Sequence, residues 1–146
     1  MSEYIIELIA ALVGSFGFSL FFNSSKKILI PATIGGLLGW GVYLLLDRCC
    51  IGVFLASMGS AAFLQIYSEV FARVLKSPTT VILIPSLIPL VPGGSLYYTM
   101  YYAALSDWSS FRFYCKETVL VAFGIAVGTS FVSAILLLLP RKNYIS

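Results

Sequence analysis

A proline- and glycine-rich break, PSLIPLVPGG at residues 85–94, interrupts a long apolar part of the chain. The apolar run TTVILI leads into it, and the tyrosine-rich run SLYYTMYYAAL leads out of it. Its prolines remove backbone N–H donors and disfavour helical geometry at the residues before them. Its glycines permit backbone angles that other residues resist. We therefore expect two half-helices joined by irregular backbone, whose architecture depends on Pro85, Pro89, Pro92, Gly93 and Gly94.

The composition is that of an integral membrane protein. Of the 146 residues, 60% are hydrophobic and 10% are charged, whereas a soluble domain is about half apolar and about a quarter charged. Inside a bilayer, irregular backbone survives only where protein buries it or where it lines a watery cavity. Secondary transporters hold their substrates at such discontinuous helices. The net charge of +3 is scattered in pairs and does not suggest a nucleic-acid partner.

Five apolar segments predict the fold. At about 1.5 Å per residue, roughly 20 helical residues cross a hydrocarbon core of about 30 Å. We expect an all-α, polytopic membrane helix bundle of about five transmembrane helices in a single domain, residues 1–146, with the fourth helix broken. The alternative is four transmembrane helices, in which case the glycine-rich second segment is the weakest candidate for a span. The segments are 4–22, 28–46, 51–72, 79–105 and 118–139.

The distribution of basic residues predicts the orientation. The first segment lacks the basic start of a signal peptide and is expected to remain as a membrane helix. Because cytoplasmic loops are enriched in Lys and Arg, the positive-inside bias favours an outside N-terminus and a cytoplasmic C-terminus. In that orientation, three basic residues lie outside, namely Arg48, Arg112 and Lys116. Six lie on the cytoplasmic side, namely Lys26, Lys27, Arg73, Lys76, Arg141 and Lys142.

Two G-x-x-x-G pairs indicate close helix contacts. They are Gly35–Gly39 in the second segment and Gly124–Gly128 in the fifth. Small residues let helix backbones approach closely, and close approach supplies the dispersion contacts that hold membrane helices together. The pairs are either packing faces within the chain or a dimerisation face.

Three carboxylates are candidates for coupling transport to a proton gradient, because the chain contains no histidine. Glu7 lies about one turn into the first segment, where a charge must snorkel, pair or be protonated. Glu69 lies four residues before Arg73 and so shares a helix face with it. Their structural alternatives are an interfacial Glu7 that reaches water and a Glu69–Arg73 ion pair. Asp107 follows the fourth segment.

Tyrosines follow the break in two rows of i, i+4 pairs, Tyr97 with Tyr101 and Tyr98 with Tyr102. They form either an aromatic belt or packing face or a row of hydroxyls along a translocation path. In the second case Tyr98 and Tyr101, with Ser95, line the path. The free N–H groups at the start of the second half-helix would attract an anion such as a substrate carboxylate.

The sequence carries no enzyme signature. There is no H-E-x-x-H, Walker loop or G-x-S-x-G. Cys49, Cys50 and Cys115 make no disulfide framework. We expect neither catalysis nor a cofactor, and no metal site.

Four stretches carry a resemblance to a known family. They are GFSLFFN (17–23), GGLLGWGVY (35–43), SEVFARVLKSPTTVILIPSLIPLVPGG (68–94) and YYTMYYAALSD (97–107). With them, the chain resembles the small, YjjB-like subunit of the threonine/serine exporter family over nearly its full length. It departs from the pattern at Ser24–Ser25, where a proline is expected near Asn23.

The resemblance implies a function. Members export small hydroxy amino acids such as threonine and serine, or dicarboxylates such as succinate, across the bacterial inner membrane with energy from the proton gradient. A larger membrane subunit of the same family is the implied partner. Glu69 leads the coupling candidates because the family-like run SEVFAR contains it. Two other functions stay open: a non-transporting membrane scaffold or assembly protein, and a self-sufficient oligomeric channel.

Overall fold

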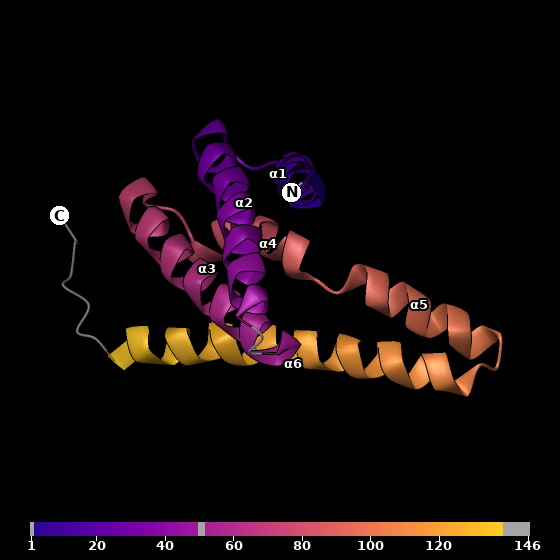
Figure 1. Ribbon diagram of the computed structural model, residues 1–146. Coiled ribbons are helices and arrows are strands. Elements are labelled where there is room, and N and C mark those ends of the chain that lie inside the picture. The colour runs from indigo at the N-terminus through magenta and orange to yellow at the C-terminus, as the bar shows by residue number, and fades with distance from the viewer. Residues whose placement is uncertain (1, 50–51, 139–146) are drawn as a thin grey trace.

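The computed structural model describes residues 2–49 and 52–138, which contain helices and no strand (Figure 1). In chain order the elements are α1 (Ser2–Phe21), α2 (Lys26–Arg48), α3 (Val53–Leu75), α4 (Thr79–Leu87), the 3₁₀ turn η1 (Ile88–Leu90), α5 (Gly93–Ala104) and α6 (Trp108–Leu138).

The predicted all-α membrane fold with a broken fourth helix is confirmed. Four helices, α1, α2, α3 and α6, are long and apolar enough to cross a membrane. The pair Thr79–Leu90 and Gly93–Ala104 qualifies only together and is bent by 53°. The described residues thus supply four spans, or five if the bent pair is a single span.

The packing of α3 against α6 favours a single broken span. On α6, Gly124 lies against Phe54 of α3, and Gly128, one turn farther along, lies against Met58 and Ala62. Since the contacts advance along both helices together, α3 and α6 run parallel. If both cross the membrane, the chain between them must cross it once, because a re-entrant loop would reverse α6. We therefore infer five crossings.

The start of the last helix differs from the prediction. The structure begins α6 at Trp108 rather than at 118. The Asp107 carboxylate accepts hydrogen bonds from the backbone amides of Ser109 and Ser110 at 3.2 and 3.3 Å, which is the role of a helix N-cap. No Gly or Pro follows until Gly124 to stop the helix.

Further predictions are affected by the helix boundaries and by the described range. Arg112 and Lys116, expected in a loop, lie within α6. Some predictions fall on residues outside the described ranges. These are the C-terminal basic pair Arg141–Lys142, the cysteine at position 50, the start of the third predicted segment at 51 and the end of the fifth at 139.

α5 and the first half of α6 form a hairpin that extends away from the other helices (Figure 1). A tight turn at Ser106, with φ of 57°, reverses the chain between them. Across the hairpin, the Tyr114 ring stacks on Tyr98 at 5.1 Å and on Tyr102 at 5.5 Å between centroids. One of the two predicted tyrosine rows therefore packs α5 on α6.

The first glycine pair lets other helices of the same chain pack closely on α2. An added Cβ at Gly39 would lie 2.6 Å from the Leu64 side chain of α3. At Gly35 it would overlap the Ser86 hydroxyl of α4. Each missing Cβ leaves the space that a neighbouring side chain fills, so the pair contacts other helices within the chain.

The second glycine pair brings α6 against the backbone of α3. An added Cβ at Gly124 would lie 2.7 Å from the Phe54 carbonyl oxygen, and at Gly128 it would overlap the Met58 carbonyl oxygen. Because a backbone oxygen cannot turn away as a side chain can, these two positions tolerate only glycine at the observed helix separation.

Candidate functional site

The break consists of three successive distortions, one at each proline. Pro85 lies inside α4, Pro89 lies in η1, and Pro92 is the N-cap of α5. Val91 has φ of −62° and ψ of 127°, the extended geometry that a following proline imposes. The irregular backbone is therefore short and centres on Val91 and Pro92.

The two glycines of the break do not adopt the unusual backbone angles that the sequence predicted for them. Gly93 and Gly94 form the first turn of α5, and neither has a positive φ. A Cβ added at either residue would meet nothing within 4 Å. The extended Val91 and the N-cap Pro92 already redirect the chain, so this conformation does not require glycine after them.

The first half of the break is held against α2. Pro85 and Ser86 are fully buried. The Ser86 hydroxyl lies 2.8 Å from the Ile82 carbonyl oxygen of its own helix and 3.0 Å from the Ala32 carbonyl oxygen of α2. A hydroxyl that bonds across the interface fixes the position of α4 on α2, and so fixes where the break begins.

A first cavity lies beside the break. We call it the Glu7 cavity, and its volume is about 250 Å³. Glu7 of α1, Trp40 of α2, and Ile88 and Pro89 of η1 contribute to its wall. The Trp40 indole N–H points at the Glu7 carboxylate across 3.4 Å. The fold thus brings together two residues that sequence reasoning had proposed separately, the coupling candidate Glu7 and the break residue Pro89.

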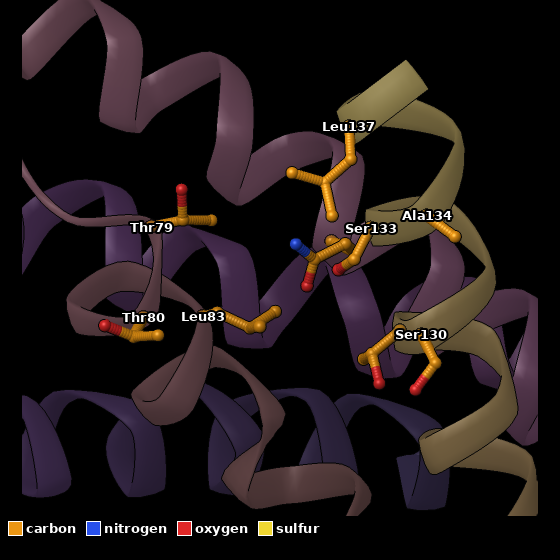
Figure 2. Close-up of a pocket in the computed structure, with 9 residues that line it drawn as sticks. Thr79, Thr80, Leu83, Ser130, Ser133, Ala134 and Leu137 are labelled. Atoms are coloured by element: carbon orange, nitrogen blue, oxygen red, sulfur yellow. The ribbon is translucent and has the colours of Figure 1, made fainter. Parts of the chain in front are cut away.

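A second, larger cavity lies between α3, α4 and α6 (Figure 2). We call it the hydroxyl cavity; it is an open groove with a volume of about 460 Å³, and Thr80, Ser130 and Leu137 on its wall are exposed. Leu83, Ala134 and Leu137 are its apolar lining. Its polar lining carries no formal charge and consists of Gln65 on α3, Thr79 and Thr80 on α4, and Thr129, Ser130 and Ser133 on α6. Sequence analysis singled out none of these six residues, because the cavity exists only once three distant segments meet.

Glu69 lies next to the hydroxyl cavity. Its Oε1 accepts hydrogen bonds from Arg73 at 3.2 and 3.3 Å, so the predicted ion pair is present. Its Oε2 accepts a hydrogen bond of 2.7 Å from the Thr79 hydroxyl. Since Thr79 also lines the hydroxyl cavity, one hydrogen bond joins the coupling candidate to the cavity wall.

The predicted path residues beyond the break lie apart from both cavities. Tyr98 and Tyr101 are 44% and 47% exposed and contribute to the wall of neither. The Ser95 carbonyl accepts a hydrogen bond from the Thr99 hydroxyl at 2.7 Å within α5. In this conformation, these three residues belong to the α5–α6 hairpin.

Asp107 occupies the turn of that hairpin. Hydrogen bonds from the Ser110 hydroxyl and from the backbone amides of Ser110 and Ser109 lower the pKa of its carboxyl. A carboxylate that is held ionised as a helix cap is poorly suited to carry a proton near neutral pH.

If the helices cross the membrane in turn, the two cavities lie toward opposite membrane faces. As the first and third candidate spans, α1 and α3 would then cross the membrane in the same sense. Glu7 is near the start of α1, and the Arg48 guanidinium at the end of α2 lies 4.3 Å from the Tyr4 ring centroid. Gln65 lies in the second half of α3, toward the face where α4 begins. The hydroxyl cavity lies at the start of α4, and η1, which follows the end of α4, contributes to the wall of the Glu7 cavity.

The comparisons with known proteins identify the family. The sequence matches the family described as Threonine/Serine exporter, ThrE, over residues 7–135. Comparisons with curated proteins and with solved structures gave no match. The family match includes α1 from Glu7, the whole of the break, both cavities except Leu137, and most of α6. This membrane protein therefore belongs to the threonine/serine exporter family.

Proposed function

We propose that the chain is the small membrane subunit of a two-component exporter of small carboxylate-bearing metabolites. The cargo would be threonine and serine, or a dicarboxylate such as succinate. Export would cross a bacterial inner membrane and be driven by the proton gradient. Membership of an exporter family supports this proposal, and one structural observation carries it: the broken fourth span lines a cavity that contains a carboxylate.

The break is favourable for transport because of where it lies. Non-helical backbone at membrane depth is stable only when protein buries it or when it faces water. Here Pro85 is buried by protein, and Pro89 lines a cavity that also holds the Glu7 carboxylate. Half-helices of this kind can tilt against their neighbours, which is how many carriers alternate access.

Proton coupling would use a carboxylate within the membrane part of the chain. Ionisable side chains in spans are costly and commonly mark proton pathways. Glu7 and Glu69 lie beside the two cavities, whereas Asp107 caps α6. We therefore keep Glu69 and Glu7 as the coupling residues, and Tyr98 and Tyr101 as candidates for the path in another conformation.

A larger partner subunit would complete the carrier. Ile6, Ile9 and Val13 leave much of α1 apolar and exposed, and this surface must face lipid or other helices. Five spans are few for alternating access, and a second membrane half would double them. The basic residues favour an outside N-terminus and a cytoplasmic C-terminus for this half.

Reconstitution tests the function. The full chain would be purified with and without a candidate larger subunit of the same family, placed in liposomes, and assayed for counterflow of L-threonine, L-serine and succinate. We expect counterflow only with both chains, and accumulation against a gradient only with an imposed proton gradient. Flux through this chain alone without a proton gradient would indicate a channel. A stable complex without any flux would indicate a scaffold.

A further inference from the structure

We propose that the hydroxyl cavity between α3, α4 and α6 is the intake site, where the exported amino acid binds before it crosses the membrane. This inference rests on the proposed export function and adds the place, the binding groups and the side of loading. The cavity is separate from the break and from the Glu7 cavity, because it lies at the opposite end of α4.

An unsatisfied amide points to a ligand. Gln65 lines the cavity and is only 7% exposed. Among the described residues its side chain makes no hydrogen bond. Its amide atoms are accessible from the cavity, so a ligand or water that enters can bind them, and largely buried polar groups in native proteins normally meet such a partner. An amide offers N–H donors to a carboxylate and a carbonyl acceptor to an ammonium.

Hydroxyl-bearing residues lie on two sides of the cavity. Figure 2 shows Thr79 and Thr80 on the α4 side and Ser130 and Ser133 on the α6 side. Thr79 already donates its hydrogen to Glu69 and can only accept from a ligand. Thr80, Ser130 and Ser133 make no hydrogen bond within the described part of the chain, so they can donate as well as accept.

The first turn of α4 adds a preference for a carboxylate. Thr79 and Thr80 are the first two residues of the helix, so their backbone N–H groups have no acceptor within it. Pro78, the N-cap, forms no side-chain cap hydrogen bond. Because these two residues line the cavity, the positive end of the helix lies beside it, as does the Gln65 amide, and both favour a carboxylate there.

The size and lining suit a small hydroxy amino acid. A volume of about 460 Å³ is within the range of about 300–1,000 Å³ for ligand pockets, with room for bound water. Uncharged polar groups on three helices match a zwitterion with one hydroxyl, while Leu83 and Leu137 offer apolar contact to a methyl group such as that of threonine. The Glu69 carboxylate, behind Thr79, balances the positive charge of the ammonium.

The side of the cavity matches export. It lies toward the face where α3 ends and α4 begins, and the predicted orientation makes this face cytoplasmic. An exporter must load from the cytoplasm. With loading at the start of α4 and release through the Glu7 cavity, the break would contribute to the release site through Pro89.

Protection of a cysteine from labelling tests the intake site directly. Cys49, Cys50 and Cys115 would be replaced by serine, and Ser133→Cys would be introduced into the full chain, expressed with and without the larger subunit. In inside-out membrane vesicles, an impermeant maleimide should label Ser133→Cys, and saturating L-threonine should slow the labelling at least about threefold. Ser109→Cys in the same background is the control. It should be labelled from the opposite face at a rate that L-threonine does not change.

Paired substitutions supply an independent measurement. Thr80→Val removes a hydroxyl from the cavity, whereas Thr33→Val removes a threonine hydroxyl that bonds to the Leu29 carbonyl of its own helix. We expect Thr80→Val and Gln65→Leu each to weaken L-threonine binding by about tenfold, the loss expected for one hydrogen bond to a charged group. Thr33→Val should bind as the parent does, and Gln65→Leu should melt no lower than the parent.

The outcomes separate this inference from the proposed function. If the parent transports L-threonine but Ser133→Cys is not protected and both cavity variants bind normally, the intake site lies elsewhere and the inference is wrong. If Ser133→Cys is protected although no preparation transports, binding at the cavity stands and the export function is wrong. Labelling of Ser133→Cys only from the outer face would contradict intake from the cytoplasm.

Discussion

Gly128→Ala should destabilise the protein, and the structure indicates by how much. The new methyl group would overlap the Met58 carbonyl oxygen and approach the backbone nitrogen of Ala62 to 3.1 Å. Forcing α6 away from α3 costs about 1–3 kcal/mol, the usual range for overpacking. The higher helix propensity of Ala offsets about 1 kcal/mol of this cost. The free energy of unfolding should therefore fall by up to about 2 kcal/mol.

Gly17→Ala is the matched control. Gly17 also lies within a helix, but an added Cβ there meets nothing within 4 Å, so only the gain in helix propensity applies. Both variants would be purified in the same detergent and melted. We expect Gly128→Ala to melt below Gly17→Ala by about 2–4 °C for each kcal/mol of packing cost. Equal melting temperatures would refute the close, parallel packing of α3 on α6.

Other predictions follow from the break and the carboxylates. Pro92→Ala should allow a more continuous fourth helix and reduce L-threonine counterflow several-fold without loss of folded protein, as size-exclusion chromatography would show. If Glu69 is the coupling residue, Glu69→Gln should abolish proton-driven accumulation but retain counterflow. If Glu7→Gln has this effect and Glu69→Gln does not, coupling is assigned to the Glu7 cavity. Asp107→Ala should destabilise the hairpin at neutral pH. The folded pKa of Asp107 is lowered from 3.8, so its contribution is full above 3.8 and is lost as the pH falls through the lower folded value. The melting difference between Asp107→Ala and the parent should therefore shrink only in strong acid.

Local signals in the sequence predicted most of the fold. Apolar runs of span length are local features, and the three prolines act on the residues next to them. The bend in the fourth span could therefore be located from the sequence. The start of α6 was missed because polar residues such as Arg112 and Lys116 suggested a loop, although the Asp107 cap and the lack of glycine favour a helix.

The candidate site was predictable only in part. Glu7 and Glu69 could be selected as scarce charges in apolar segments, but their neighbours could not. The Glu7 cavity joins residues of α1, α2 and η1, and the hydroxyl cavity joins residues of α3, α4 and α6. Single threonines and serines in a helix give no signal until another helix supplies the opposite wall. The tyrosine rows gave a strong local signal, yet Tyr98 stacks on Tyr114 across the hairpin.

Sided cysteine labelling tests most directly whether the broken segment crosses the membrane between the two cavities. In a chain without other cysteines, Ser77→Cys precedes α4 and Ser106→Cys follows α5. We expect an impermeant maleimide to label Ser77→Cys only in inside-out vesicles and Ser106→Cys only in right-side-out vesicles. Labelling of both residues from the same face would mean a re-entrant loop, and would contradict a path that runs along α4 from one membrane face to the other.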